Sequence, residues 1–174
     1  MNVIVSSSLN PDSNSRILAQ EAQRIFEQDG QPVTLLDLRD HPLPLCDGNA
    51  AYGHPGIQPV ARILNAARTI IIATPIYNYD GTAAVKNLIE LTGRSWDGKV
   101  VGFLCAAGGM SSYMSIMSLA NSLMLDFRSI IVPRFVYATG DAFAAGKIVD
   151  PEQLRRVAEL VRTTARMGGL LQAA

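Results

Sequence analysis

The sequence predicts an α/β fold, a three-layer sandwich in which helices cover both faces of a five-stranded parallel sheet. Five short apolar runs lack strict polar alternation, which is typical of strands buried on both faces. Segments with helical periodicity alternate with these runs, and such alternation indicates parallel strands joined by right-handed crossovers. The 174 residues suit one domain covering residues 1–174.

The expected strands are rich in Val, Ile and Leu. They cover residues 2–5, 33–36, 69–74, 100–106 and 130–132. Five strands in this alternation favour the order 2-1-3-4-5, the flavodoxin-like arrangement, over a six-stranded sheet of the Rossmann type. In this order the connections reverse direction between the first and third strands, and ligands bind at the carboxyl ends of strands beside such a reversal.

The expected helices follow from apolar residues at helical spacing. This spacing marks residues 14–29, 60–67, 85–92, 114–123 and 154–161. The first helix is expected to end at Asp29-Gly30 and the third at Gly93. The last helix has Asp150 as a candidate N-cap and Pro151 at its first position.

Composition limits the classes of function. Fifteen basic residues balance fifteen acidic ones, so neither a nucleic-acid surface nor a polybasic membrane patch is expected. No apolar stretch approaches the roughly 20 residues that span a bilayer, and no signal peptide precedes Val3, so we expect a cytoplasmic protein. Cys46 and Cys105 lack metal-type spacing and are expected as free thiols. Residues 39–56 form a long irregular stretch that suits a lid, a binding edge or an interface segment.

The first turn carries hydroxyl and amide side chains and no glycine. It reads SSSLNPDSNS over residues 6–15 and leads into the first helix, whose N-terminus favours an anion. Further donors would come from Ser8, Ser13, Asn14 and Ser15. Because neither a P-loop nor a G-x-G-x-x-G motif occurs, the turn suits a terminal monophosphate better than ATP or NAD. The alternative is an ordinary serine-rich loop with one N-cap.

Two later loops are expected at the same edge of the sheet. The third strand runs into Tyr77, Asn78 and Tyr79, an aromatic and amide cluster suited to a flat heterocycle. The fourth strand runs into Gly108 and Gly109, where the backbone can approach a ligand closely. Together the three loops match a long ligand with a phosphate at one end and a ring system at the other.

Three segments carry recognisable motifs. They read SSLNPDSNSR at residues 7–16, TPIYN at 74–78 with VKN at 85–87, and WDGKVV at 96–101 with AGG at 107–109. With these segments, residues 2–135 resemble the NAD(P)H-dependent FMN reductase family of flavodoxin-like flavoproteins, which includes quinone, azo and chromate reductases. The family patterns are G-S-x-R-x-x-S-x-N-R, T-P-E-Y-N before L-K-N, and a G-G turn after W-x-G-K-x-V.

The chain departs from these patterns at several positions, of which three bear on the cofactor. Ser8, Ser13 and Arg16 keep their places in the first motif, whereas Asn10 replaces an arginine and Ser15 replaces an asparagine. Ile76 stands where the second motif has a glutamate. Losing the arginine weakens the attraction for phosphate, and Ile76 removes a polar group near the flavin, but the backbone-based site is kept.

The resemblance implies that FMN binds without a covalent bond. NADPH or NADH would pass a hydride to flavin N5, and a small acceptor such as a quinone, a free flavin or an azo dye would then be reduced at the same place. The implied cofactor contacts are Ser8, Asn10, Ser13, Asn14, Ser15, Pro75, Ile76, Tyr77, Asn78, Tyr79, Ala107, Gly108 and Gly109. Since the cofactor carries the chemistry, neither a catalytic acid–base pair nor a metal site is expected.

Assembly and the exact activity are separate questions. Family members are usually dimers or tetramers, and the apolar surface of residues 113–127 predicts a homo-oligomer contact. One alternative activity is a flavodoxin-type electron carrier, although such carriers are typically acidic and this chain is neutral. Another alternative is a non-flavin binding module on the same fold. The sequence leaves the choice between NADH and NADPH open.

Overall fold

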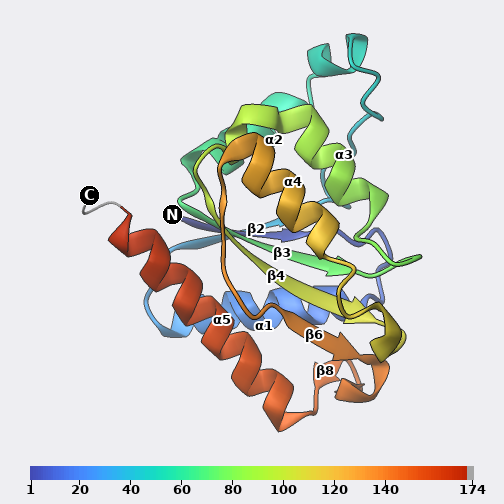
Figure 1. The fold of residues 1–174 in the computed structure, drawn as a ribbon, viewed down its shortest axis with the longest axis vertical. Helices are drawn as coiled ribbons and strands as arrows, with labels where there is room; N and C mark the ends of the chain where they lie inside the picture. Colours follow the sequence, from blue (N-terminus) through green and yellow to red (C-terminus); the bar gives the residue numbers. More distant parts are fainter. Residues whose placement is uncertain (172–174) are drawn as a thin grey trace.

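The computed structural model describes residues 1–171, in which helices cover both faces of one parallel sheet (Figure 1). Its strands are β1 (Asn2–Ser6), β2 (Val33–Asp37), β3 (Thr69–Pro75), β4 (Val100–Ala107), β5 (Ile130–Ile131) and β6 (Val136–Thr139). The order β2-β1-β3-β4-β5, with every pair parallel, confirms the predicted flavodoxin-like arrangement. Residues 172–174, the end of the predicted domain, lie outside the described residues.

The fifth position of the sheet is shared by two short strands. β5 pairs with the start of β4 at Val100 and Val101, and β6 pairs with its end from Leu104 to Ala107. Pro133 cannot donate a backbone hydrogen bond, and Arg134 has a left-handed φ of 61°. These two residues therefore interrupt the strand and separate β5 from β6. The predicted strand 130–132 is therefore only the first half, and β6 was not predicted.

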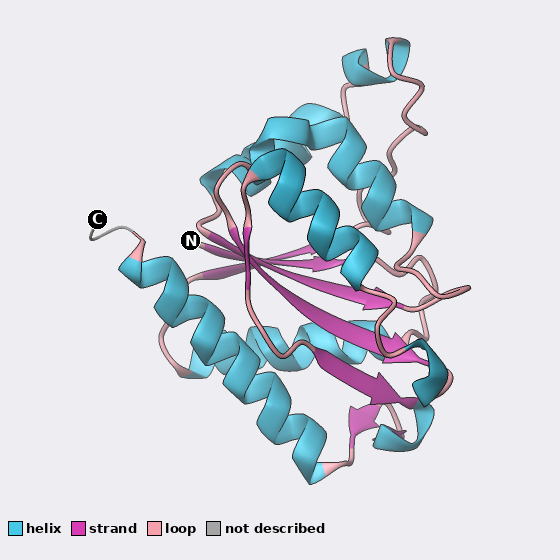
Figure 2. Cartoon of the chain, in the orientation of Figure 1, coloured by secondary structure: helices cyan, strands magenta, loops and turns pink. Residues whose placement is uncertain are grey.

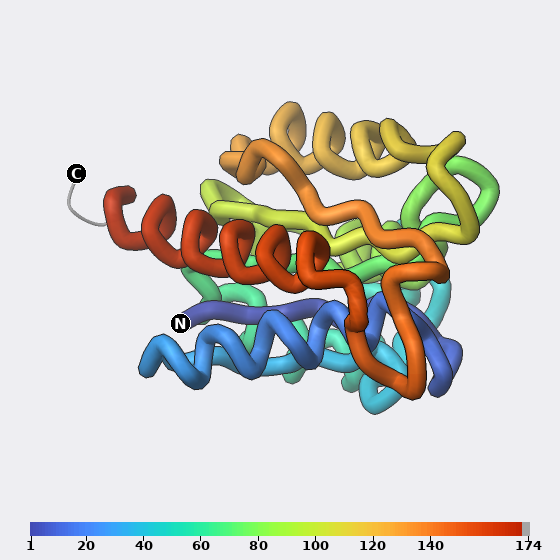
Figure 3. The backbone as a smooth tube through the Cα atoms, turned by 90° about the horizontal axis from the view of Figure 1, so that it is seen from below, coloured from blue at the N-terminus to red at the C-terminus, as the bar shows by residue number. Residues whose placement is uncertain are grey.

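Five α-helices form the outer layers. They are α1 (Asn14–Gln28), α2 (Ile57–Ala66), α3 (Ala83–Thr92), α4 (Met117–Phe127) and α5 (Pro151–Leu170). α1 and α5 lie side by side on one face (Figure 3), and α2, α3 and α4 cover the other face (Figure 1). Alternate strand residues separate two cores, because Ile4 and Leu104 pack toward α1 and α5 whereas Val5 and Phe103 pack toward α2 to α4.

Shorter elements complete the chain. The antiparallel hairpin of β7 (Phe143–Ala144) and β8 (Lys147–Ile148) was not predicted. Single-turn 3₁₀ helices cover Ala50–Gly53, Gly93–Trp96, Met110–Ser112 and Gly140–Ala142.

Most helix boundaries follow local sequence signals. α1 ends at Gln28 just before Gly30, whose φ is 66°, and α5 begins after Asp150, whose carboxylate accepts from the Glu152 N–H at 2.8 Å. One expectation is wrong, because Met114 precedes α4 instead of lying within it. The apolar spacing at Met114 belongs to the preceding turn, so periodicity alone placed the start of this helix too early.

Residues 39–56 extend away from the sheet and carry a 3₁₀ turn at their tip (Figure 2). Asn87 of α3 fixes the base of this segment. Its Oδ1 accepts from the Cys46 N–H and its Nδ2 donates to the Pro44 carbonyl, both at 2.8 Å. The predicted irregular segment is thus anchored to α3, the helix that follows Tyr77, Asn78 and Tyr79.

Two adjacent glycines of α5 have opposite surroundings. A Cβ at Gly168 would clash with Cγ2 of the buried Thr69 on β3, whose hydroxyl is held by Asn2 Oδ1 at 2.7 Å. Gly169 has no atom within 4 Å of the corresponding position. Gly168 therefore sets how closely α5 approaches the sheet.

We expect Gly168→Ala to lower the free energy of unfolding by about 1–3 kcal/mol through overpacking, despite its better helix propensity. The matched variant Gly169→Ala should leave that free energy unchanged or raise it by up to about 1 kcal/mol. Urea unfolding followed by circular dichroism measures both. Equal effects of the two substitutions would contradict the close packing of α5 on β3.

Candidate functional site

Three loops leave the carboxyl ends of the adjacent strands β1, β3 and β4. The register pairs Ser6 with Ala73, and Pro75 with Ala106, so these strands end at nearly the same level. The loops therefore emerge side by side at the carboxyl-end edge of the sheet, where the strands end, beyond the arrowheads in Figure 2. A ligand at this edge would meet residues that lie about 100 positions apart in the sequence.

The first loop is held in shape by its own side chains. Ser8 is buried, and its hydroxyl accepts from the Asn10 N–H at 3.2 Å. Asn10 is exposed, and its Oδ1 accepts from the Asp12 N–H at 3.0 Å. These short-range bonds use acceptor capacity only, so the Ser8 hydroxyl and the Asn10 amide keep hydrogens to donate.

The N-terminus of α1 is left uncapped although a capping residue is present. Ser13 occupies the N-cap, yet its hydroxyl bonds to the Ser15 hydroxyl at 2.8 Å instead of to the first turn of the helix. The N-caps of α3 and α5, Thr82 and Asp150, do accept from their helices. The Arg16 N–H donates to the Ser13 carbonyl at 3.0 Å, so the Asn14 and Ser15 N–H groups are the ones left free to bind an anion.

Arg16 adds little positive charge to this loop. Its guanidinium pairs with Asp37, a buried carboxylate at the end of β2. Arg39 forms a second ion pair with the same carboxylate, with its Nε 3.6 Å from Asp37 Oδ1. Because the Asp37 carboxylate compensates the charge of Arg16, and because Asn10 replaces the arginine of the family motif, this loop has no free cation among the described residues 6–16. Its attraction for an anion must therefore come from N–H groups and hydroxyls.

The second loop turns sharply and exposes two aromatic rings. Tyr77 and Asp80 exchange backbone hydrogen bonds of 2.9 and 3.1 Å, and Asn78 and Tyr79 between them have φ values of 50° and 67°. Two left-handed central residues define a type I′ turn, which is strained for a tyrosine. Tyr77 and Tyr79 are 55% and 57% exposed, so the turn presents aromatic residues to a ligand or partner.

A hydroxyl network joins the second loop to the first. The Thr82 hydroxyl lies 3.1 Å from the Ser7 hydroxyl and accepts from the Val85 N–H, and the Thr82 N–H donates to Thr74 Oγ1 at 3.2 Å. All three hydroxyl residues are buried. Sequence reasoning missed this network, although a threonine just before the helical period of α3 is an N-cap signal.

The third loop, called the glycine loop below, begins with two residues that have no side chain, Gly108 and Gly109. Gly108 and Gly109 are exposed, neither has a positive φ, and a Cβ at either would meet no atom within 4 Å. Nothing in the chain itself therefore requires glycine here, whereas a ligand lying against the backbone would.

Tyr137 of β6 supports the glycine loop. Its hydroxyl donates to the Gly109 carbonyl at 2.7 Å, and burial raises the pKa of this phenol, which keeps it protonated as a donor. Sequence reasoning missed Tyr137 because β6 was not predicted, and no local pattern links it to the loop.

The remaining predicted site residues lie close to the strand ends. Pro75 and Ala107 are the last residues of β3 and β4, and the Ile76 N–H continues the ladder by donating to the Ala106 carbonyl at 2.8 Å. Asn14 is half-buried at the start of α1. Ser15 is fully buried, so its hydroxyl acts on the loop through Ser13.

A cavity of about 490 Å³ adjoins the first turn of α1. It lies between Ser13, Asn14 and Arg16 on one side and the β7–β8 hairpin, residues 143–146, on the other. The unpredicted hairpin therefore forms one wall of the space beside the free N–H groups, and this space is large enough for part of a small ligand.

Other chemical groups are sparse. Both cysteines are free thiols, and burial strongly raises the pKa of Cys105. Within residues 1–171, no three His, Cys, Asp or Glu side chains are grouped to hold a metal ion. None of the helices in this range is long and apolar enough to cross a bilayer.

Comparisons with known proteins identify the family of the chain. A sequence model described as NADPH-dependent FMN reductase matches residues 2–144. An NAD(P)H-dependent FAD/FMN reductase from Geobacillus thermodenitrificans is 33% identical over 150 residues, 84% of this chain and 80% of the relative. An FMN-dependent NADH:quinone oxidoreductase from Haemophilus influenzae is 27% identical over 170 residues, 82% of this chain and 87% of the relative.

Solved structures share the fold at low identity. A flavoenzyme NAD(P)H:(acceptor) oxidoreductase from Paracoccus denitrificans has a TM-score of 0.79 at 20% identity, covering 97% of this chain and 96% of that chain. A flavodoxin from the domain Archaea has a TM-score of 0.67 at 12% identity, covering 97% and 99%.

Proposed function

The chain belongs to the NADPH-dependent FMN reductase family, and from this premise we propose that it binds FMN across the three loops and passes a hydride from a nicotinamide dinucleotide to a small acceptor. Quinones, free flavins and azo compounds are the proposed acceptor class. The observation that carries the proposal is the uncapped N-terminus of α1, where Ser13 leaves the first N–H groups free for a phosphate.

The residues present fit FMN at both ends. The phosphate would meet the Ser8 and Ser13 hydroxyls together with the first N–H groups of α1. The flat ring would lie along the open backbone of Gly108 and Gly109, where a side chain would otherwise intrude. The thirteen residues predicted from the sequence make up the proposed site, with Ser15 acting through Ser13.

The chain binds and orients the cofactor. When bound, FMN supplies the chemistry of accepting and releasing a hydride. The Tyr77–Asp80 turn is fixed to α4 because Asp80 Oδ1 accepts from the Ser118 hydroxyl at 2.6 Å, so exposed aromatic rings stay at the mouth of the site. The buried network of Ser7, Thr74 and Thr82 holds the first and second loops at a fixed separation.

The proposal extends to location and assembly. A cytoplasmic location agrees with the two free thiols, Cys46 and Cys105, since thiols stay reduced there. A homodimer or homotetramer would cover the apolar side chains that α4 and its preceding turn expose. These are Met114, Met124 and Leu125.

The visible spectrum tests the activity. We expect the purified protein to show the absorption of oxidised flavin and to bleach directly on anaerobic addition of NADPH or NADH. A bound flavin that neither dinucleotide reduces would favour an electron carrier. A colourless protein whose addition leaves FMN fluorescence unquenched would favour a non-flavin module.

Removing the hydroxyls of the first turn should weaken cofactor binding. We expect Ser13→Ala with Ser15→Ala to raise the dissociation constant for FMN about tenfold or more, because hydrogen bonds to a phosphate are lost. Fluorescence titration of the apoprotein measures this constant. Ser129→Ala is the matched control. It removes a buried hydroxyl that donates to the Trp96 carbonyl just before β5, at the amino ends of the strands and away from the three loops. Unchanged affinity in the double variant would place the phosphate elsewhere.

Assembly is tested at the most exposed apolar residue of α4. Leu125 is 86% exposed, and we expect Leu125→Glu to reduce the molar mass measured by size-exclusion chromatography with light scattering. Val149→Glu, at an exposed apolar residue next to β8, should leave the mass unchanged. A wild-type protein that is monomeric at all concentrations would contradict the proposed assembly.

A further inference from the structure

Another groove lies beside β5 and β6, the strands at one side of the sheet, and only its Tyr113 belongs to one of the three loops. It has a volume of about 520 Å³ and runs between α5 and the segment that interrupts the fifth strand. Its lining includes Pro133, Arg134 and Phe135 of that segment, with Arg155, Arg156, Glu159 and Arg166 of α5 and Tyr113 beside them. A concavity of this size suits a small ligand.

The groove is strongly basic in a chain that is neutral overall. Four arginines and a single carboxylate, Glu159, line it, although the chain has fifteen basic and fifteen acidic residues. A wall of one charge sign around a concavity raises the local concentration of ligands of the opposite sign. The groove therefore selects for an anion.

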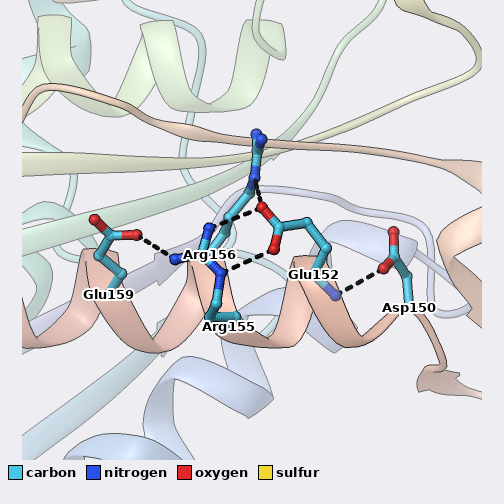
Figure 4. A network of polar contacts seen from close by, with 5 residues as sticks. All are labelled: Asp150, Glu152, Arg155, Arg156 and Glu159. Atoms are coloured by element: carbon cyan, nitrogen blue, oxygen red, sulfur yellow. Dashed lines mark hydrogen bonds and ion pairs between the residues drawn. The ribbon is translucent and has the colours of Figure 1, made fainter.

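The arginines fall into two pairs with different surroundings. Arg155 and Arg156 are held by carboxylates of their own helix, as Figure 4 shows, and their hydrogen bonds lower the pKa of Glu152 to about 2. Arg134 and Arg166 are exposed and form no ion pair within residues 1–171. The uncompensated charge of the groove therefore resides on Arg134 and Arg166.

An aromatic cluster connects this groove to the glycine loop. The Tyr113 ring lies 5.0 Å from the Phe135 ring and 5.4 Å from the Tyr137 ring, measured between centroids. Tyr137 in turn donates to the Gly109 carbonyl at 2.7 Å. Through Tyr113, the lining of the groove is therefore one ring contact away from Tyr137, the residue that holds the glycine loop.

We propose that this groove binds the adenosine half of NADPH, with Arg134 and Arg166 recognising its 2′-phosphate. The inference rests on the proposed function and adds a preference for NADPH over NADH. Guanidinium groups bind phosphate through two parallel hydrogen bonds, and an aromatic wall such as Phe135 and Tyr113 offers a face to adenine. NADH lacks the 2′-phosphate and would leave both arginines without an anionic partner.

The test is the FMN-loaded double variant Arg134→Gln with Arg166→Gln, which keeps two exposed polar side chains and removes their charge. In anaerobic stopped-flow, we expect the dissociation constant for NADPH to rise about tenfold or more while the limiting rate of flavin reduction stays the same. The constant for NADH should change less than about twofold. Arg62→Gln is the matched control, because Arg62 is exposed on α2 and lies outside the groove.

A second measurement needs no flavin reduction. Calorimetry with 2′,5′-ADP should show binding to the wild-type protein, about tenfold or more weaker binding to the double variant, and weaker binding of 5′-AMP than of 2′,5′-ADP to the wild-type protein. Equal binding of both nucleotides, or of 2′,5′-ADP to both proteins, would overturn the inference.

The two proposals fail in distinguishable ways. A wild-type flavin that neither dinucleotide reduces would overturn the proposed function, and calorimetry would still decide whether the groove binds a 2′-phosphate. A wild-type flavin that is reduced, with NADPH constants equal in both proteins, would overturn only the role of the groove. Equal losses for NADPH and NADH would exclude recognition of the 2′-phosphate.

Discussion

The parallel hydrogen-bond ladder of β1, β3 and β4 determines which loops can share a ligand. Its register pairs Ser6 with Ala73 and Pro75 with Ala106, so three loops distant in sequence start side by side. A slip of one residue would turn Val5 or Phe103 toward the opposite helix layer and disrupt both cores. The packing that stabilises the sheet is therefore the same constraint that assembles the site.

The loops combine firm anchoring with unused binding capacity. Thr82 ties the first loop to the second through buried hydroxyls, and Tyr137 holds the glycine loop by its carbonyl. By contrast, Ser13 leaves α1 uncapped, and a capping bond to that helix would be worth about 1 kcal/mol. The free protein forgoes this stability, and a phosphate bound there would restore it by stabilising only the folded state.

Sequence reasoning predicted the elements with strong local signals and missed those set by tertiary contacts. The buried apolar runs and the caps at Gly30 and Asp150 located the sheet and most helices, because these signals lie within a few residues. The hydroxyls of the first turn and Gly108 were likewise visible as local composition. β6 was missed because Pro133 ends the apolar run before it, and the Tyr137 contact joins residues 28 positions apart. Partnerships of that kind follow from sheet pairing, which a single sequence does not encode locally.

The interruption of the fifth strand has two physical consequences. An edge strand offers unpaired N–H and C=O groups to other chains, and proline with a left-handed residue at Pro133 and Arg134 breaks that row. The same break separates β5 from β6 and brings Arg134 and Phe135 to the groove that α5 forms with this segment. Because the aromatic contacts of Tyr113 link this segment to Tyr137 and the glycine loop, one irregularity protects the edge of the sheet and extends the candidate site along it.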